Sequence, residues 1–323
     1  MIKKMKVLAA YFLAAFLAAP IACAQSYPDK PVRIVVPFAA GGGVDVVARV
    51  MARHLSDKIG QNVYVENRPG ASGNLGADVV MRSAADGYTL LISASTFVVN
   101  PVVAAERPLF DPLKDFTHIA LIAKGPLLFI VNPDVASSVQ EFVAKAKAEP
   151  SKYNFATGGF GSAGHMAAES FKIKAGLSIP VVLYRGTGPV FTDLMGGHIS
   201  AIMDPLVTSL PLAHSGRAKA LAISDSKRSA LAPEVPTFAE VGFKDFQFYT
   251  WYGLWGPPNI PASVVTKIEA AVQEIGKSPE AKKWFESQGL DFSGMSGLPF
   301  LDFERMEQSN YAEIMKAGNI ARR

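Results

Sequence analysis

The sequence contains almost no cysteine and little histidine. Cys23 is the single cysteine among 323 residues, and it lies in an apolar N-terminal segment. A core of this size can be stable without disulfide bonds, so we expect none. The five histidines are scattered, without metal-ligand spacing and without cysteine companions. We therefore expect neither a metal site nor a metal cofactor.

An excess of charge is also absent once the N-terminal segment is set aside. Residues 1–24 carry three lysines and no acid, so their removal lowers the formal net charge from +4 to +1. No basic footprint for nucleic acid remains. These residues have the order of a secretory signal peptide: the lysines, an apolar run over 7–21, and small residues at 22–24. We predict export to the periplasm and cleavage after Ala24.

A lipoprotein cut before Cys23 is the alternative, but Pro20 stands where such sites usually carry an aliphatic residue. Apart from this segment, no apolar run reaches membrane-spanning length. The 299 residues that follow Ala24 favour two domains over one.

Strand-like and helix-like segments alternate along most of this chain, which predicts an α/β fold. Residues 119–123 and 127–131 are predicted to be two strands, whereas prolines make 94–118 irregular. Aromatic residues crowd 233–261, before a tail of helices. We expect one lobe from 25–131 plus 251–323 and a second from 132–250, with hinge crossings near 127–133 and 247–256. Each lobe is expected to hold a mostly parallel sheet flanked by helices.

The most distinctive stretch begins with the β-branched strand at 32–36 and continues into Gly41, Gly42 and Gly43. Apolar residues recur every four positions from Val47 to Ile59, which indicates a helix that Gly60 ends. A bare glycine loop at a helix start presents free N–H groups and a positive dipole end. It is typical of an anion site, although an ordinary tight turn remains an alternative.

Residues 157–164 repeat this design between a strand and a helix that starts near Ser162. Their glycines also match a dinucleotide fingerprint, but no acid follows about twenty residues later to bind a ribose. A serine nucleophile elbow would need glycine where Phe160 stands. We therefore expect a second anion-binding loop, and neither a cofactor nor a catalytic residue. His165 fits a structural role or a ligand contact equally well.

Polar residues also follow other predicted strands, where ligands bind in open α/β sheets. They are Ser95 and Thr96 in the first lobe, and Tyr184, Gly186, Thr187 and Asp204 in the second. Asp45 is ambiguous, because an acid in the first helical turn also stabilises the helix itself. Arg49 should lie on the other face of that helix, in solvent.

Several motifs, taken in order, resemble the substrate-binding proteins of tripartite tricarboxylate transporters, the TctC or Bug family. In the first lobe they are Val36-Pro37-Phe38-Ala39-Ala40-Gly41-Gly42, with Asp45 and Arg49, and Glu66-Asn67-Arg68-Pro69-Gly70. In the second they are Gly161-Ser162-Ala163-Gly164-His165, Tyr184-Arg185-Gly186 and Asp193-Leu194-Met195-Gly196-Gly197-His198. The family usually carries proline near Ala40 and often Gly-Ala-Pro at 187–189, so the pocket shape differs here.

The resemblance implies a two-lobed clamshell of type II-like periplasmic binding proteins that captures a small organic carboxylate. It implies a monomer without cofactor or catalysis, which delivers its ligand to membrane permease subunits. One jaw would contain Phe38, Ala40, Gly41, Gly42, Asp45, Ser95 and Thr96. The other would contain Thr157, Gly161, Ser162, Tyr184, Gly186, Thr187 and Asp204. Phe38 would cover the apolar part of the ligand, or serve only in packing.

Two other functions use the same scaffold. A periplasmic signalling module would close on its ligand in the same way, so the sequence does not separate it from a transport receptor. Genetic linkage to permease subunits or to a sensor kinase would do so. A hydrolase is disfavoured, because Ser162 has no aspartate and histidine partners at suitable spacing.

Overall fold

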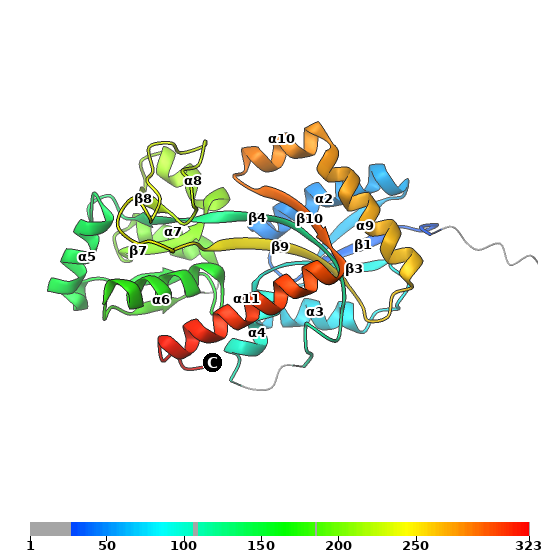
Figure 1. Cartoon of the computed structure of the whole chain (residues 1–323), viewed down its shortest axis with the longest axis horizontal. Helices are drawn as coiled ribbons and strands as arrows, with labels where there is room; N and C mark the ends of the chain where they lie inside the picture. The colour runs from blue at the N-terminus through cyan, green and yellow to red at the C-terminus, as the bar shows by residue number, and fades with distance from the viewer. Residues whose placement is uncertain (1–26, 106–108, 185, 323) are drawn as a thin grey trace, which may run out of the picture.

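The computed structural model describes residues 27–105, 109–184 and 186–322. The predicted signal peptide and its cleavage site lie outside these residues. Within them, ten strands form two sheets, A and B, that share one long strand, β4 (Thr117–Val131). Figure 1 shows this strand running beside β9 (Tyr249–Gly256) from one half of the molecule to the other.

Sheet A has the strand order β2-β1-β3-β9-β4, with β10 paired to β4. β1 pairs in parallel with β2 and β3, whereas β9 is antiparallel to both β3 and β4, and β10 is antiparallel to β4. The bounds of the remaining strands are Val32–Val36 for β1, Val63–Asn67 for β2, Thr89–Ala94 for β3 and Asp291–Ser296 for β10.

Sheet B continues from the far end of β4 in the order β4-β7-β5-β6, and β8 also pairs with β4. β5 is parallel to β6 and β7, while β7 and β8 are antiparallel to β4. The bounds are Phe155–Thr157 for β5, Val181–Leu183 for β6, Ala201–Pro205 for β7 and Lys219–Ile223 for β8.

Both sheets are therefore mixed, which corrects the prediction of mostly parallel sheets. The reason is that β4 and β9 carry the chain between the two halves in opposite directions, so each lies antiparallel among its neighbours. The two strands predicted at 119–123 and 127–131 are parts of β4. The aromatic stretch contains β9, and the stretch 94–118, which was predicted to be irregular, contains helix α4 (Thr96–Val103) with Pro101 inside it.

Helices cover both faces of sheet A, because its central strands are apolar on both sides. In β1, Ile34 faces a core shared with α2 and α9, whereas the next residue, Val35, faces a core shared with α3, α4 and α11. The helix bounds are Gly43–Ile59 for α2, Asn74–Met81 for α3, Ala262–Lys277 for α9, Pro279–Ser287 for α10 and Gly297–Ala317 for α11.

Sheet B is covered in the same way. Phe129 of β4 packs into a core with α5 and α6, while its neighbour Leu128 faces a core with α7 and α8. The helix bounds are Val139–Ala148 for α5, Ala163–Ala175 for α6, Thr187–Met195 for α7 and Leu206–His214 for α8. Consecutive residues of one strand thus stabilise two different helical layers.

A third connection between the halves is made by α11, which crosses from sheet A towards α6 (Figure 1). An apolar cluster joins it to α4 and α6, and its buried members are Val99, Val103, Met166, Tyr311 and Met315. The last helix of the chain therefore ties the two halves together alongside β4 and β9.

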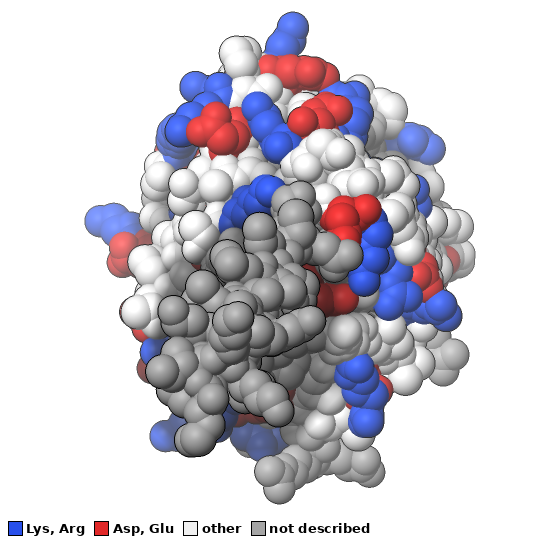
Figure 2. Space-filling view, turned by 90° about the vertical axis from the view of Figure 1, so that its right-hand side faces the viewer, with Lys and Arg blue, Asp and Glu red and all other residues white. Residues whose placement is uncertain are grey.

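Local signals set several boundaries. The Ser138 side chain accepts a hydrogen bond from the Glu141 N–H and so caps the start of α5, while the Glu141 carboxylate accepts from the Ser137 N–H. Gly60 and Gly176 end α2 and α6 in left-handed conformations, as predicted. None of the described helices is both long and apolar enough to cross a membrane. On the face in Figure 2, acidic and basic side chains are interspersed outside the grey atoms.

Candidate functional site

Hydrogen bonds to the Asp45 side chain fix the first glycine loop, between β1 and α2. Gly41 has a φ of +86°, and its N–H donates to Asp45 Oδ2 at 2.9 Å. The Asn67 amide donates both to Asp45 Oδ1 at 2.9 Å and to the Phe38 carbonyl at 3.0 Å. Asp45 is 3% exposed. Its carboxylate thus fixes the loop to the end of β2.

Asp45 is negatively charged in this setting. Burial alone would raise its pKa, but hydrogen bonds from Arg49, Gly41 and Asn67 lower the pKa below the usual value. Arg49 Nε donates to Asp45 Oδ2 at 2.9 Å, and its Nη2 reaches Asn67 Oδ1 at 3.2 Å. The predicted exposure of Arg49 is confirmed, since its side chain is 54% exposed, but the prediction that it lies on the other face of the helix is wrong. Protein donors engage both oxygens of Asp45, which supports its structural interpretation.

The exposed part of this loop offers unpaired donors. The N–H groups of Gly42, Gly43 and Val44 make no hydrogen bond to any residue that the structure describes. They lie at the positive end of α2, which is 17 residues long. Ala40, Gly41 and Gly42 are exposed, and a Cβ on Gly43 would lie 2.8 Å from the Tyr252 hydroxyl. The loop is thus an open anion cradle with Tyr252 directly beside it.

The second glycine loop, between β5 and α6, has the same construction. Gly161 has a φ of +74°, and its N–H donates to His165 Nδ1 at 3.1 Å. Ser162 Oγ accepts from the His165 N–H at 3.2 Å and lies 3.0 Å from Thr157 Oγ1. The N–H groups of Ala163 and Gly164 make no hydrogen bond within the described residues. In both loops, a left-handed glycine is held by the side chain four residues later.

The two loops belong to different sheets, and the second loop contacts α4 of the sheet A half. A Cβ on Gly161 would lie 2.9 Å from the Val103 side chain, which belongs to the helix that follows β3 of sheet A. The start of α6 therefore meets the end of α4 in van der Waals contact. This contact joins the second glycine loop to a helix of the sheet A half.

A third helix start joins the second loop. The Gly186 N–H donates to the Gly158 carbonyl at 2.7 Å, and a Cβ on Gly158 would lie 2.7 Å from both N and Oγ1 of Thr187. The structure thus brings together five of the predicted residues of the second jaw: Thr157, Gly161, Ser162, Gly186 and Thr187.

Tyr184 is used differently from the prediction. Its hydroxyl donates to Asp193 Oδ2 at 2.5 Å, so the phenol ties β6 to α7. This hydrogen bond, together with burial, raises the pKa of Tyr184 to about 12. The hydroxyl is therefore committed to a contact inside its own half of the molecule.

The hydroxyls at the start of α4 also divide into two roles. Ser95 is 1% exposed, and its side chain interacts with the Tyr311 phenol on α11. The Thr96 hydroxyl is enclosed, yet it has no hydrogen-bond partner among the described residues. Since a buried hydroxyl without a partner is costly, Thr96 is the better candidate for a ligand contact.

Asp204 ends β7 and is 4% exposed. Its Oδ2 accepts hydrogen bonds from the Thr208 and Ser209 hydroxyls. Its pKa is raised from 3.8 to about 7, because burial raises it by more than the two hydroxyl donors lower it. The Tyr252 hydroxyl of β9 lies close to Gly43 in the first loop, and the charge of Asp204 contributes to the raised pKa of Tyr252. Asp204 and Tyr252 thus lie beneath the helix starts, although sequence reasoning missed Tyr252 because its strand was not predicted.

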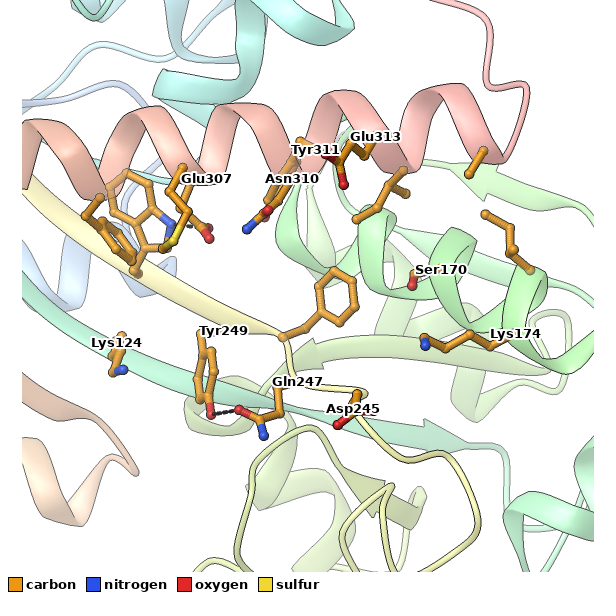
Figure 3. Close-up of a pocket in the computed structure, with 17 residues that line it drawn as sticks. Lys124, Ser170, Lys174, Asp245, Gln247, Tyr249, Glu307, Asn310, Tyr311 and Glu313 are labelled. Atoms are coloured by element: carbon orange, nitrogen blue, oxygen red, sulfur yellow. Dashed lines mark hydrogen bonds between the residues drawn. The ribbon is translucent and has the colours of Figure 1, made fainter.

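A separate concavity of about 620 Å³ lies between α11, α6 and the segment that leads into β9 (Figure 3). Lys124 and Lys174 lie at its opposite ends, and Glu307 and Asn310 project from α11. None of the predicted site residues lines it. Its wall carries acids as well as lysines, and it has no glycine loop at a helix start. It is therefore a poorer anion site than the loops. Among the described residues, no three His, Asp or Glu side chains gather as metal ligands.

Comparison with known families identifies the family to which this chain belongs. Residues 47–320 match the model of the "Tripartite tricarboxylate transporter family receptor", TctC. The chain belongs to this family. Protein BugT of Bordetella pertussis is 35% identical to this TctC receptor over 292 residues, which cover 90% of the chain and 89% of BugT.

Solved structures agree. The periplasmic binding protein BugD superposes with a TM-score of 0.83 at 29% identity and covers 92% of the TctC chain and all of BugD. Rpa4515 of R. palustris with adipate gives 0.87 at 31% identity, with coverages of 91% and 99%. MatC of Rhodopseudomonas palustris with bound malate gives 0.80 at 28% identity, with coverages of 89% and 99%. The predicted family and the two-lobed α/β class of periplasmic binding proteins are confirmed.

Proposed function

We propose that this TctC receptor captures a small organic carboxylate between its two glycine loops and delivers it to the membrane permease subunits of a tripartite transporter. Family membership supports the transport role. The ligand class is supported by two relatives whose structures contain adipate and malate. The observation that carries the proposal in this chain is the pair of loops with unpaired N–H groups at the starts of α2 and α6.

These loops suit a carboxylate for a physical reason. Backbone N–H groups at helix starts bind anions through directed hydrogen bonds and the helix dipole, without requiring an arginine. The side chains that hold the two loops, Asp45 and His165, already accept the N–H groups of Gly41 and Gly161. The ligand would therefore use the next N–H groups, from Gly42 to Val44 on one side and at Ala163 and Gly164 on the other.

The jaws would close about β4 and β9. Lobe 1 would consist of 25–131 plus 251–323 and lobe 2 of 132–250, with crossings near 127–133 and 247–256. The pairing of β4 supports a crossing near Leu127, because its first part pairs with β9, whereas Leu127–Val131 pairs with β7 and β8 and so lies in the sheet of lobe 2. The receptor would act as a monomer. The hydroxyl of Thr96 and the side chain of Phe38 would complete the pocket.

The remaining parts of the proposal concern location and chemistry. The chain would reach the periplasm through its signal peptide, cut after Ala24. It would act as a receptor without catalysis. In support, Ser162 Oγ accepts a hydrogen bond from a backbone N–H at the start of α6, which is the role of a helix cap.

The test is calorimetric titration of the mature protein, residues 25–323, with adipate, malate, a tricarboxylate, an amino acid and an aromatic acid. At least one carboxylate is expected to bind and to raise the melting temperature, because it binds only the folded state. Gly41→Val should abolish that binding, since the side chain enters the cradle.

A matched control is Gly60→Val. Gly60 has a φ of +69° and Gly41 one of +86°, and at neither residue would an added Cβ meet another atom within 4 Å. Both variants thus carry the same backbone strain, roughly 1–2 kcal/mol, but only one lies in the cradle. Equal affinity of the two variants would contradict the proposed site, and failure of every carboxylate to bind would contradict the ligand class.

A further inference from the structure

Asp204 is a buried carboxyl group whose position connects the two loops. It pairs in register with Leu128 of β4. A Cβ on Gly164, at the start of α6, would lie 2.1 Å from the carbonyl oxygen of Met203, so this helix packs directly on the strand beside Asp204. Tyr252 reaches from the side of Asp204 to Gly43 in the first loop. Asp204 is therefore linked to the first loop through Tyr252, and its strand supports the start of α6.

The two oxygens of Asp204 have different surroundings. Oδ2 accepts from Thr208 and from Ser209, the latter at 3.2 Å. Oδ1 makes no hydrogen bond to any described residue, although the whole residue is only 4% exposed. The same two hydroxyls also lie 2.9 Å and 2.6 Å from the Pro205 carbonyl, so Oδ1 is the carboxyl oxygen left for a proton or a ligand contact.

No cation compensates a charge on Asp204 within the described part of the chain. The groups that face it are Leu128 from β4, the two hydroxyls of α8 and Tyr252 from β9. Tyr252 is the titratable one, and burial raises its pKa to about 12, so it stays neutral. Burial without a cationic partner raises the pKa of Asp204 to about 7.

We propose that Asp204 is protonated in the ligand-bound receptor, so that binding a carboxylate above neutral pH takes up one proton from solvent. This inference rests on the proposed carboxylate function and adds to it. Two carboxylates that share a site do not both stay ionised, because their repulsion in a dry environment favours one proton between them. The ligand anion and the proton enter together, and the Oδ1–H group becomes a donor.

Asp204 would then determine specificity. In its neutral form it donates a hydrogen bond, which suits a carboxylate or carbonyl oxygen of the ligand. In its ionised form it only accepts, and it repels an anion. Affinity for a carboxylate should therefore be constant below about pH 7 and fall tenfold for each pH unit above it.

The experiment is titration calorimetry of residues 25–323 with adipate and with malate at pH 6.0 and pH 8.0. Each titration is repeated in two buffers of different ionisation enthalpy, so that the number of protons taken up is measured directly. A group with a pKa of about 7 is roughly nine-tenths ionised one unit higher. We expect uptake of close to one proton at pH 8.0 and close to none at pH 6.0.

Asp204→Asn should remove both the proton uptake and the loss of affinity between these pH values. Glu304→Gln is the matched control, because Glu304 is also buried with a raised pKa but lies on α11 against His118 and Trp255. It should take up protons as the wild type does. Circular dichroism checks that both variants fold, and the wild-type proton count stands without them.

The outcomes separate the two proposals. If a carboxylate binds at pH 8.0 with no proton uptake, or if Asp204→Asn takes up as many protons as the wild type, the role of Asp204 is overturned and the receptor function stands. If neither probe binds at either pH and the wider set of acids also fails, the proposed function is overturned and this inference with it.

Discussion

Replacing Asp45 with alanine is the most direct test of how the first loop is held. Asp45 accepts hydrogen bonds from the Gly41 N–H and the Asn67 amide, each at 2.9 Å, and from Arg49. The variant leaves the first two donors without their acceptor. We expect both a loss of stability and a looser loop, because this carboxylate links Gly41 to Asn67, whose side-chain nitrogen would keep only its hydrogen bond to the Phe38 carbonyl among the described residues.

The magnitude follows from the three contacts. A hydrogen bond to a charged group contributes about 1.5–3 kcal/mol, and the exposed loop regains part of this from water. The Arg49 side chain is 54% exposed, so its ion pair contributes under about 1 kcal/mol. The free energy of unfolding should therefore fall by about 3 kcal/mol in Asp45→Ala. In Arg49→Ala it should fall by less than about 1 kcal/mol.

Urea unfolding of both variants at pH 7 measures these changes, and calorimetry with the carboxylate that binds best measures the effect on the loop. Asp45→Ala should weaken binding at least about tenfold, whereas Arg49→Ala should change it little. Because the pKa of Asp45 is lowered in the fold, its contribution to stability should disappear as the pH falls below about 4. Equal destabilisation by the two variants would refute the reasoning, since the ion pair would then hold the loop.

Two further predictions concern other parts of the site. Gly161→Val should abolish binding and also destabilise the fold, because its Cβ would lie 2.9 Å from Val103 and the backbone is strained at a φ of +74°. Calorimetry measures the loss of binding, and urea unfolding measures the loss of stability. Unchanged affinity would contradict the second jaw. Asp204→Asn should be more stable than the wild type at pH 8. The raised pKa makes the wild type lose on the order of 4 kcal/mol as the pH rises from about 4 to 7, so a pH-independent difference in urea unfolding would contradict it.

Local features of the fold were predictable because short stretches of sequence determine them. The strand at 32–36 has four of its five residues buried, as its β-branched composition indicates. Ser138 and Glu141 have the spacing of a capping box, and Ser138 caps the helix, although the Glu141 carboxylate accepts from the Ser137 N–H. The helix over 262–277 begins and ends where its sequence predicts. The position of both glycine loops between a strand and a helix followed from the same local patterns.

Long-range pairing was not predictable in this way. The aromatic run at 249–256 has no alternation between apolar and polar residues, and it becomes a strand because β3 and β4 pair with it from both sides. Pro101 argued against a helix, yet α4 is short and its Asn100 amide is fixed by Asn74. The support that Arg49 and Asn67 give to Asp45 likewise depends on the neighbouring strand β2, which the sequence of the loop does not contain.

The concavity beside α11 has a practical consequence for measuring ligand capture. A chain cut after Ala24 retains no cysteine, so one introduced thiol is a unique attachment point for a fluorescent dye. Asn310→Cys would place that dye on α11, facing a wall formed by α6 and the segment that leads into β9. The body of α11 packs on sheet A, whereas this wall belongs to the other half of the molecule, so any change in their spacing alters the polarity around the dye. The C-terminal helix thus offers a built-in optical readout of ligand binding.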